Sequence, residues 1–306
     1  MAQPNPGLDP ASRQRLVDRF GVHVEHWFDE LPGVLAIVSD RWLIQRREQI
    51  PRGSVSIVFR CHIADGRDAV LKLSPDRARL AWEAAALGAW TSVHVPDVLR
   101  FDEELGALLI EAIEPGTPLE MSSEYPSIES IGELIGALHG GKRDPFFPTV
   151  EQRVASLFES SHRLYRRHPE VADVISPERY QQGRTLGERL ARVESRDALL
   201  HGDLTPSNIL FGGEERGLVA IDPAPCIGDA AFDAVDLVLW RADSLSTIEH
   251  RAERLAVLME LDASAILSWC VAFAGMNALE LATTPGTPSD QIDAVQMLAA
   301  LVEEAL

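Results

Sequence analysis

The sequence predicts an α+β fold, with a small, strand-rich N-terminal part and a large, mainly helical C-terminal part. The prediction rests on β-like stretches between residues 46 and 113, one helix embedded among them, and helical patterns through most of the remainder. A chain of 306 residues can bury more than one core and ordinarily divides into domains. We place the division after residue 114, which gives an N-terminal domain of residues 1–114 and a C-terminal domain of residues 115–306.

The first elements are predicted to be helices. Residues 11–45 have mainly helical patterns, but Pro32 and Gly33 are poor helix formers, so we expect them to interrupt the helix. From about residue 46 the pattern changes to strands.

A β-hairpin is predicted next. The stretches 54–63 and 68–74 are rich in β-branched and other apolar residues, and Asp65 and Gly66 lie between them. Both residues tolerate positive φ, which a tight hairpin turn requires. The other predicted elements are a helix over 77–90 that opens at Ser74-Pro75-Asp76, strands near 98–104 and 106–113, a break at 115–118, and short strands near 209–211 and 218–221.

The chain is strongly acidic. Its formal net charge is −19, from 28 lysines and arginines against 47 aspartates and glutamates. This charge repels the phosphates of nucleic acids and attracts cations, so we expect no nucleic-acid partner and a cationic small molecule as substrate. A role in solubility alone would give the same composition, and that alternative stays open.

Signals for export or membrane insertion are not recognised in the sequence. The first 20 residues contain no apolar core of the signal-peptide kind, and no apolar run approaches the length of a membrane span. Cys61, Cys226 and Cys270 are unevenly spaced and form no CxxC pair. We therefore predict a cytoplasmic protein with no membrane partner, whose cysteines are small core residues.

The segment 201–208, His-Gly-Asp-Leu-Thr-Pro-Ser-Asn, places polar residues directly after an apolar stretch. It matches the kinase catalytic-loop pattern H-R-D-L-x-x-x-N, except that Gly202 replaces the arginine. Phosphoryl transfer to a hydroxyl needs a carboxylate that orients the nucleophile, and Mg²⁺ that prefers oxygen ligands. Asp203 is the candidate catalytic residue. The candidate metal-binding pair is Asn208 and Asp222, and Asp222 ends a later apolar stretch.

A second candidate pair lies in the N-terminal part. Lys72 is in a predicted strand, and Glu83 follows eleven positions later in the predicted helix. A strand lysine paired with a helix glutamate holds the α- and β-phosphates of a nucleotide in kinase-like folds. Both residue types are common at such places, so this pair alone is weaker evidence than segment 201–208.

Five segments together resemble the aminoglycoside phosphotransferase superfamily: AVLKLS, WEAAALGAW, LIEAIEPGTPL, LHGDLTPSNIL and VAIDPAPCIGDAAFDAVDLV. The last is most similar to the branch of streptomycin 6-phosphotransferases and hydroxyurea phosphotransferases, and the resemblance extends over about residues 45–245. It implies a bilobal protein-kinase-like fold that binds ATP between its lobes and a hydroxyl-bearing small molecule on the large lobe. It also implies roles for single residues: Asp203 as catalytic base, Lys72 as phosphate ligand, Glu83 as the residue that orients Lys72, and Asn208 and Asp222 as Mg²⁺ ligands.

The resemblance further implies where the rest of the nucleotide binds. The backbone that would form the adenine-binding hinge is that of Glu111, Ala112 and Ile113. The G-x-G-x-x-G pattern of protein kinases is missing. We place the phosphate loop where small side chains would let backbone N–H groups approach phosphate, at Gly53, Ser54 and Ser56.

The acceptor is expected to be small. In regulated protein kinases, the arginine that Gly202 replaces binds the phosphorylated activation loop. Only about six residues separate Asp222 from a helix expected near Gly228. A peptide would have no docking segment there, so no protein substrate is expected. Three acids of the late segments could meet a cationic acceptor: Asp236, Asp243 and Glu280.

Several other polar residues have structural interpretations. His201 is expected to brace its loop, and His139 to end its helix beside Gly140. The acids that follow Gly228 are expected to be caps and loop anchors, namely Asp229, Asp233 and Asp236.

Two classes of function remain. The first is an ATP- and Mg²⁺-dependent phosphotransferase that acts on a small cationic hydroxyl compound, such as the antibiotic streptomycin, and so confers resistance. Hydroxyurea, choline, homoserine or a sugar are alternative acceptors for the same fold, because the motifs do not encode the acceptor. The second is a nucleotide-binding pseudokinase, which is disfavoured because Lys72, Asp203, Asn208 and Asp222 are all present.

Overall fold

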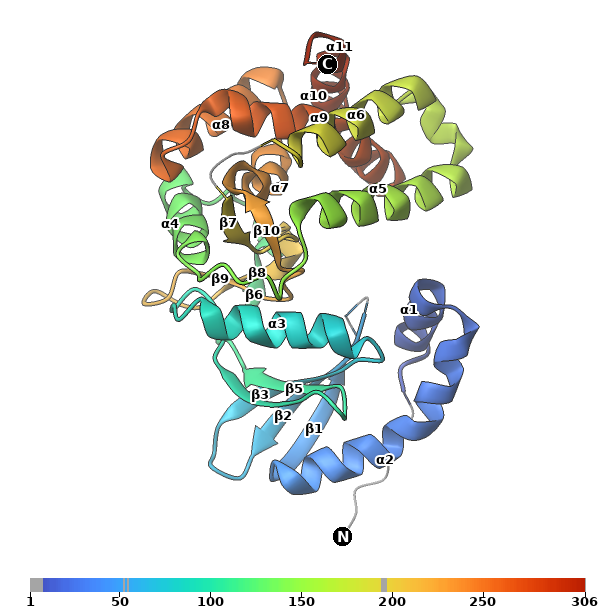
Figure 1. Cartoon of the computed structure of the whole chain (residues 1–306), viewed down its shortest axis with the longest axis vertical. Coiled ribbons are helices and arrows are strands. Elements are labelled where there is room, and N and C mark those ends of the chain that lie inside the picture. The colour runs from blue at the N-terminus through green and yellow to red at the C-terminus, as the bar shows by residue number, and fades with distance from the viewer. Residues whose placement is uncertain (1–7, 52, 54, 194–196, 306) are drawn as a thin grey trace. The chain divides into compact units, whose positions relative to one another are not determined.

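The computed structural model describes residues 8–51, 53, 55–193 and 197–305, and the chain forms two compact units. The first unit comprises Met1–Ala89 and Val95–Gly116, and the second comprises Trp90–His94 and Thr117–Leu306. The large sheet lies in the first unit and most helices lie in the second (Figure 1).

The first unit is built on a five-stranded antiparallel sheet in the order β1-β2-β3-β5-β4. The strands are β1 (Ile44–Ile50), β2 (Ile57–Ile63), β3 (Asp68–Leu73), β4 (Val98–Asp102) and β5 (Ala107–Glu111). The predicted hairpin of β2 and β3 is confirmed, and Gly66 has a φ of 88° in its turn. We did not predict β1, because its sequence is mostly polar; such strands are found at sheet edges, where charged side chains block further pairing.

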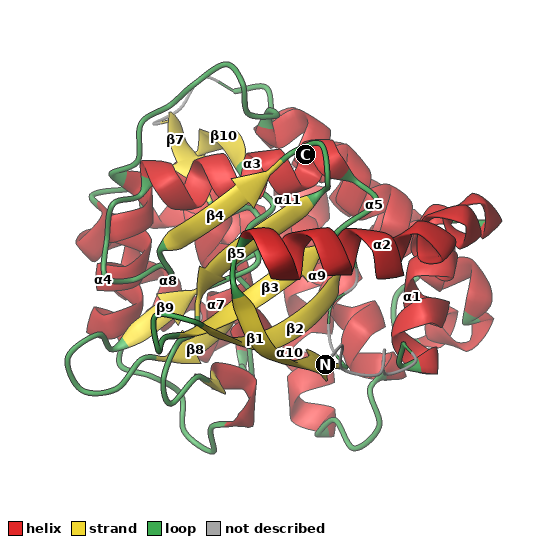
Figure 2. Cartoon of the chain, turned by 90° about the horizontal axis from the view of Figure 1, so that it is seen from below, coloured by secondary structure: helices red, strands yellow, loops and turns green. Residues whose placement is uncertain are grey.

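Helices lie on both faces of this sheet. The first unit contains α1 (Pro10–Phe20), α2 (Glu25–Arg41) and α3 (Arg77–Ala89). α2 crosses one face (Figure 2), where its buried apolar residues share a core with the strands, and α3 lies on the other face (Figure 1).

The predicted interruption at Pro32 and Gly33 is wrong, because α2 continues through both residues. A proline inside a helix costs about 3 kcal/mol. Burial of each large apolar side chain stabilises by about 1.5–3 kcal/mol, and α2 buries Phe28, Leu31, Leu35 and Val38. Tertiary packing therefore outweighs the local preference.

The start of α3 also differs from the prediction. Asp76 caps the helix, since its Oδ1 accepts the N–H of Arg79 at 3.1 Å, and Ser74 Oγ accepts the N–H of Asp76 at 3.1 Å. Pro75 thus precedes the helix instead of occupying its first position.

The second unit is mainly helical. Its helices are α4 (Ile128–His139), α5 (Val150–Arg167), α6 (Pro177–Leu190), α7 (Val235–Leu239), α8 (Leu245–Met259), α9 (Ala263–Thr283), α10 (Ser289–Ala300) and α11 (Val302–Ala305). Its short strands are β6 (Thr117–Pro118), β7 (Asp197–Leu200), β8 (Ile209–Phe211), β9 (Leu218–Ala220) and β10 (Cys226–Asp229). β6, β8 and β9 form one sheet, and β7 pairs with β10 in another.

The strands β8 and β9 were predicted, whereas β7 and β10 were not. The helix expected near Gly228 is wrong at that residue, because Gly228 lies in β10 opposite Ala198. A short 3-10 helix, Ala230–Ala234, follows the strand and leads into α7.

α9 is the one described helix that is long and apolar enough to cross a membrane, with 21 residues and a mean hydropathy of 1.5. The expectation that no apolar run approaches that length is therefore wrong. However, 56% of its apolar window is buried inside the structure, and the helix packs against α6 and α10. A helix that is apolar on all sides is typical of a protein core.

The three cysteines are buried and free, which confirms their predicted role as core residues.

Candidate functional site

The loop 201–208 follows β7 in the second unit. His201 is fully buried; its Nδ1 accepts the backbone N–H of Asp203 at 3.3 Å, so we assign the proton to Nε2, which donates to the carbonyl of Ile221 at 3.0 Å. Burial lowers the pKa of His201 below its usual value, which keeps the ring neutral. The predicted bracing role of His201 is confirmed.

Asp233 anchors the same loop. Its Oδ2 accepts the N–H of His201 at 2.8 Å, and its Oδ1 accepts the N–H of Gly202 at 2.9 Å. His139 Nε2 lies 3.1 Å from Oδ2, so this histidine does more than end α4. Burial alone would raise the pKa of Asp233, but the hydrogen bonds to His139 and to the Gly202 N–H, with the electrostatic effect of the neighbouring imidazoles, outweigh burial and lower the pKa. Asp233 is thus a loop anchor, as predicted.

Gly202 occupies a position that no other residue fits. Its φ is 73°, and a Cβ there would lie 2.1 Å from the carbonyl oxygen of Ala224. The departure from the arginine of the H-R-D pattern therefore has a local steric reason.

Asp203 has both carboxylate oxygens held. Arg153 Nη2 donates to Oδ1 at 2.8 Å, and Asn208 Nδ2 donates to Oδ2 at 3.1 Å and to the Asp203 carbonyl at 2.9 Å. The Asp203 side chain remains 33% exposed. A carboxylate that is fixed on both oxygens and still open to solvent can receive a further hydrogen-bond donor.

The topology brings Asn208 and Asp222 to the same end of one strand pair. Asn208 immediately precedes β8, Asp222 lies just beyond β9, and the two strands are antiparallel with Ile209 opposite Ala220. The Asn208 carbonyl also accepts the N–H of Ile221 at 2.8 Å. Asp222 has a φ of 56°, a conformation that Asn and Asp adopt more readily than most residues.

The donor set fits Mg²⁺ because it consists of oxygen atoms. Asn208 uses its amide nitrogen for the two hydrogen bonds to Asp203, which leaves Oδ1 as an acceptor. The described residues contain no group of three or more His, Cys, Asp or Glu that could hold a metal ion by itself. Phosphate oxygens and water would have to complete the coordination, as is usual for Mg²⁺.

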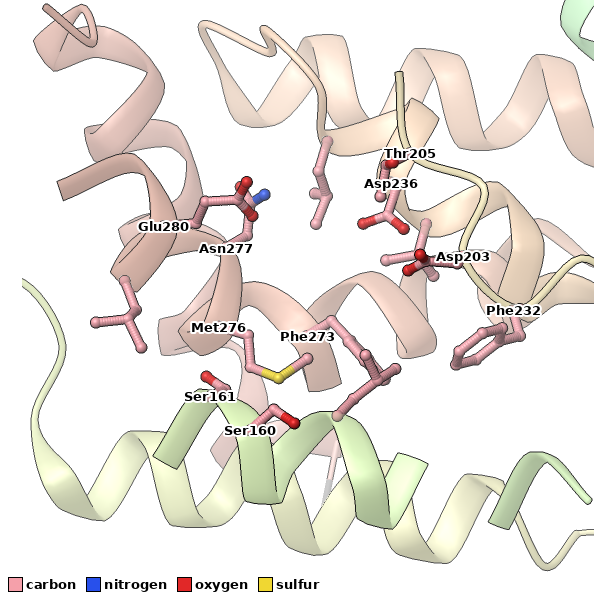
Figure 3. A pocket seen from close by; sticks show the side chains of 15 residues that line it. Ser160, Ser161, Asp203, Thr205, Phe232, Asp236, Phe273, Met276, Asn277 and Glu280 are labelled. Atoms are coloured by element: carbon pink, nitrogen blue, oxygen red, sulfur yellow. The ribbon is translucent and has the colours of Figure 1, made fainter. Parts of the chain in front are cut away.

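A cavity of about 450 Å³ lies beside Asp203 in the second unit, within the range of small-molecule sites (Figure 3). Its apolar wall comes from Leu157, Phe232, Val235, Leu239, Phe273, Met276 and Leu279, and its polar groups include Asp203, Thr205, Asp236, Asn277 and Glu280. Figure 3 shows Asp203 and Asp236 on one side of the cavity and Asn277 and Glu280 on the other.

Among the acids that line the cavity, Asp236 has the largest shift in pKa. Asp236 is an exposed residue of α7, and it lines the cavity. Limited hydration, together with the negative charges of Asp203 and Glu280, raises the pKa of Asp236 to about 7. Partial desolvation beside the cavity wall and the negative charge of Asp203 also raise the pKa of Glu280, although its side chain is exposed. The expectation that Asp236 is a cap or anchor is therefore wrong, and its alternative interpretation as an acid available to a ligand fits its position.

Asp243 lies outside this cavity. Its Oδ1 accepts hydrogen bonds from Ser244 and Thr247 at the start of α8, so it belongs to a helix terminus. Asp229 likewise acts as the predicted cap, since its Oδ1 accepts the N–H of Ala231.

In the first unit, Lys72 Nζ donates to Glu83 Oε1, which joins β3 to α3. Lys72 is 3% exposed and Glu83 is 7% exposed. The two residues thus form a buried ion pair at the spacing that the sequence suggested.

The candidate phosphate loop is fixed at its edges. Gly53 has a φ of 108°, and its carbonyl accepts Arg15 Nε at 3.2 Å. Ser56 is buried, and Ser74 Oγ donates to the Val55 carbonyl at 2.8 Å. Ser54 lies outside the described residues.

The candidate hinge follows β5. The N–H of Glu111 donates to the backbone carbonyl of Asp97 at 2.9 Å, and the N–H of Ala112 donates to the backbone carbonyl of Asp68 at 3.4 Å. Within the described ranges, the N–H of Ile113 makes no backbone hydrogen bond, so this N–H is the one available to a ligand.

Comparison with known proteins gives a direct result. The model of the aminoglycoside/hydroxyurea antibiotic resistance kinase family matches residues 41–284. The chain belongs to this family. Streptomycin 6-kinase from Streptomyces griseus is 29% identical over 268 residues, which are 83% of each chain. Hydroxyurea phosphotransferase from Kitasatospora aureofaciens is 29% identical over 254 residues, which are 78% of this chain and 73% of that protein.

A solved structure supports the fold. A complex of the aminoglycoside phosphotransferase APH(4)-Ia with ADP and hygromycin B aligns with a TM-score of 0.55 at 15% identity, over 88% of this chain and 97% of that one. The predicted resemblance, the kinase-like α+β fold class and the assignment as a small-molecule kinase are thereby confirmed.

Two residues of this antibiotic resistance kinase were not identified from the sequence. Arg153 lies 50 positions before Asp203, and nothing in the local pattern of α5 distinguishes it from the other basic residues there. Asn277 lies in an apolar helix, and its Oδ1 is buried without a hydrogen-bond partner among the described residues. The signal in the sequence that could have identified Asn277 is a single amide side chain within a long apolar stretch.

Proposed function

We propose that the protein transfers the γ-phosphoryl group of ATP to a hydroxyl of a small cationic molecule and thereby confers resistance to an antibiotic. The observation that supports this most directly is the position of Asp203. Its carboxylate is fixed by Arg153 and Asn208, remains partly exposed, and lines a cavity that carries two further acids.

Asp203 would orient the acceptor. The acceptor hydroxyl donates its hydrogen bond to the carboxylate, its oxygen forms a bond to the γ-phosphorus, and the bond from that phosphorus to the β–γ bridging oxygen breaks. The products are a phosphate ester and ADP, and the hydroxyl proton passes to Asp203. His201 and Asp233 would act at a distance, by fixing the loop that carries Asp203.

The nucleotide would be bound by residues that hold its phosphates and base. Lys72 would contact phosphates while Glu83 orients its amine, and the N–H of Ile113, in the segment Glu111 to Ile113, would bind adenine. The backbone around Gly53 to Ser56 would cover the phosphates. We accordingly assign residues 1–114 to nucleotide binding and residues 115–306 to catalysis and the acceptor.

Asn208 and Asp222 would hold Mg²⁺ through their side-chain oxygens. Bound there, the ion would neutralise charge on the ATP phosphates. The prediction for this chain is that activity requires Mg²⁺ or Mn²⁺. Asp222→Asn is the suitable variant because asparagine also tolerates the positive φ of this position.

The cavity favours a cation as acceptor. Asp236 and Glu280 are acceptors, with no arginine or lysine among the described residues that line the cavity, and Asn277 lies beside Glu280. Guanidinium and ammonium groups would supply both positive charge and N–H donors. The apolar wall would cover the carbon skeleton of the same molecule.

The names of the relatives supply specific candidates. Streptomycin carries guanidinium groups and fits the charge of the cavity, whereas hydroxyurea is neutral and serves as the alternative acceptor. Choline, homoserine and sugars remain acceptors to be compared. Because ATP and antibiotic targets are found in the cytoplasm, we place the activity there.

The test is a phosphorylation screen with purified protein, ATP and Mg²⁺. We expect streptomycin-like cations to be phosphorylated, with an acceptor KM that rises with salt, because screening acts over about 10 Å at 0.1 M ionic strength. Glu280→Gln should raise KM for the cation, whereas Glu253→Gln, the same charge change at an exposed site of α8, should not. Phosphorylation of neutral acceptors only would refute the cationic assignment, and absence of any phosphoryl transfer would refute the function.

A further inference from the structure

We propose that Arg153 is a positioning residue for catalysis, which holds the Asp203 carboxylate in the orientation that the acceptor hydroxyl meets. This inference rests on the proposed role of Asp203. It adds a residue from a different element, since Arg153 lies on α5 and the loop motif does not include it.

Arg153 makes two hydrogen bonds to consecutive residues of the loop. Its Nε donates to the carbonyl of Gly202 at 2.6 Å, and its Nη2 donates to Asp203 Oδ1 at 2.8 Å. The Arg153 side chain is 10% exposed. A planar guanidinium that grips a backbone oxygen and a carboxylate at the same time fixes the rotation of the carboxylate relative to the backbone.

The backbone at Arg153 is itself fixed in place, because α5 begins with a capping box. The N–H of Gln152 donates to Thr149 Oγ1 at 3.3 Å, and Gln152 Oε1 accepts the N–H of Thr149 at 3.0 Å. The N–H of Arg153 then donates to the Thr149 carbonyl at 3.1 Å. Arg153 thus lies in the first turn of a helix whose start is well defined.

The start of α5 is tied to the strands that carry the loop. Thr149 forms a parallel bridge with Ile227 of β10, and the N–H of Ile227 donates to Pro148 at 2.8 Å. Ile227 in turn pairs with Leu199 of β7, two residues before His201. Backbone pairing therefore sets the distance between Arg153 and the loop.

Gly228 permits this close approach. A Cβ at Gly228 would lie 2.3 Å from Val150 Cγ1 and 2.4 Å from Val150 Cβ. A side chain there would push away the first turn of α5, and with it Arg153. The glycine that the sequence analysis took for a helix start thus has a role in packing.

Arg153 and Gly202 together give the loop a guanidinium that its own sequence lacks. The loop arginine of the H-R-D pattern is excluded by the contact between Gly202 and Ala224. Arg153 brings a guanidinium to the Asp203 carboxylate from α5, outside the loop. Because small errors in the placement of a catalytic group cost up to about 10²-fold in rate, fixing this carboxylate should act on kcat.

The experiment compares Arg153→Met, Arg153→Lys and the parent enzyme in steady-state kinetics and thermal unfolding. In Arg153→Met we expect kcat to fall about 10- to 100-fold, with KM for ATP and for the acceptor changed less than about threefold. Arg153→Lys should retain more activity, because lysine keeps the charge but cannot form both bonds in one plane. The matched control is Arg166→Met at an exposed position of the same helix, where the same side-chain change should leave kcat unaltered.

Three results would overturn the inference. These are a kcat of Arg153→Met within twofold of the parent, a raised KM with unchanged kcat, or a loss of activity that equals the loss of folded protein in both Arg153 variants. Asp203→Asn separates this inference from the proposed function. If Asp203→Asn stays active, the role of Asp203 on which this inference rests has failed; if it is inactive and Arg153→Met is normal, only the role of Arg153 has failed. Absence of phosphoryl transfer in the parent enzyme would refute the proposed function itself.

Discussion

Asp233 accepts the backbone N–H of Gly202 at 2.9 Å across 31 residues of sequence, and it accepts the N–H of His201 with its other oxygen. A single buried carboxylate thus defines the start of the loop that carries Asp203. The loop is held by charge-assisted hydrogen bonds to its backbone, which leaves the side chain of Asp203 available for chemistry.

Asp233→Asn should destabilise the protein by about 1.5–3 kcal/mol, the usual contribution of a hydrogen bond to a charged group. The amide has one oxygen, so its NH₂ group would face one of the two backbone N–H donors. The loss should be measured by denaturant unfolding. Asp293→Asn, the same change at an exposed position of α10, is the control and should unfold like the parent.

The same carboxylate predicts a pH dependence. Its pKa is lowered in the folded state, so its contribution to stability is fully present above the ordinary pKa of an aspartate and is lost as the pH falls through the lowered folded value. The difference in unfolding free energy between the parent and Asp233→Asn should therefore shrink in acid. A difference that grows in acid would contradict the assignment.

Gly202→Ala should lower both stability and activity. The positive φ alone costs a non-glycine residue roughly 1–2 kcal/mol, and the contact of the new Cβ with the Ala224 carbonyl adds to that cost. Gly136→Ala in α4 is the control, because Gly136 has no atom near its missing Cβ. That control should raise stability by about 0.5–1 kcal/mol, through helix propensity. Equal unfolding midpoints of the two variants would contradict the prediction.

Variants of the buried pair Lys72 and Glu83 should distinguish an effect on protein stability from an effect on nucleotide binding. Lys72→Met removes the ion pair of the buried Glu83 with Lys72 and should cost about 3–5 kcal/mol. The double variant Lys72→Met/Glu83→Met should regain much of this stability, since replacement of a buried ion pair by apolar residues is often neutral. ATP affinity, measured by calorimetry, should remain low in both variants. Normal ATP affinity in the stable double variant would exclude Lys72 as a phosphate ligand.

Asp236 predicts how acceptor binding depends on pH. Because its pKa is raised to about 7, the carboxylate gains its negative charge as the pH rises through that value. Affinity for a cation of constant charge should therefore increase between pH 6 and 8, by up to about tenfold per pH unit below the pKa. Calorimetric titration without ATP measures this effect, and Asp236→Asn should flatten the profile. A flat profile in the parent would show that Asp236 does not meet the cation.

Much of the chemistry was predictable because it follows local sequence. The loop 201–208 and Asp222 flank two short strands that the sequence indicated, and their antiparallel pairing alone brings Asn208 and Asp222 to one end. Lys72 and Glu83 lie on a predicted strand and a predicted helix, so their pairing could be suggested from the order of elements.

Long-range placement was not predictable from one sequence. The contact between Arg153 and Asp203 depends on how α5 is tied to β10, and both strands β7 and β10 were missed because they are only four residues long. The continuation of α2 through Pro32 depends on tertiary burial of its apolar face, which a local propensity does not measure.

The central claim is that the Asp203 carboxylate serves the acceptor hydroxyl, and single-turnover phosphoryl transfer by Asp203→Asn tests it most directly. Calorimetry should find ATP affinity within about threefold of the parent, because ATP is held by other groups, while the transfer rate falls by at least about 10²-fold. Asp197→Asn, the same change at an exposed position at the start of β7, should leave the rate unaltered. A transfer rate for Asp203→Asn close to that of the parent, in protein with the same unfolding midpoint, would contradict the assignment.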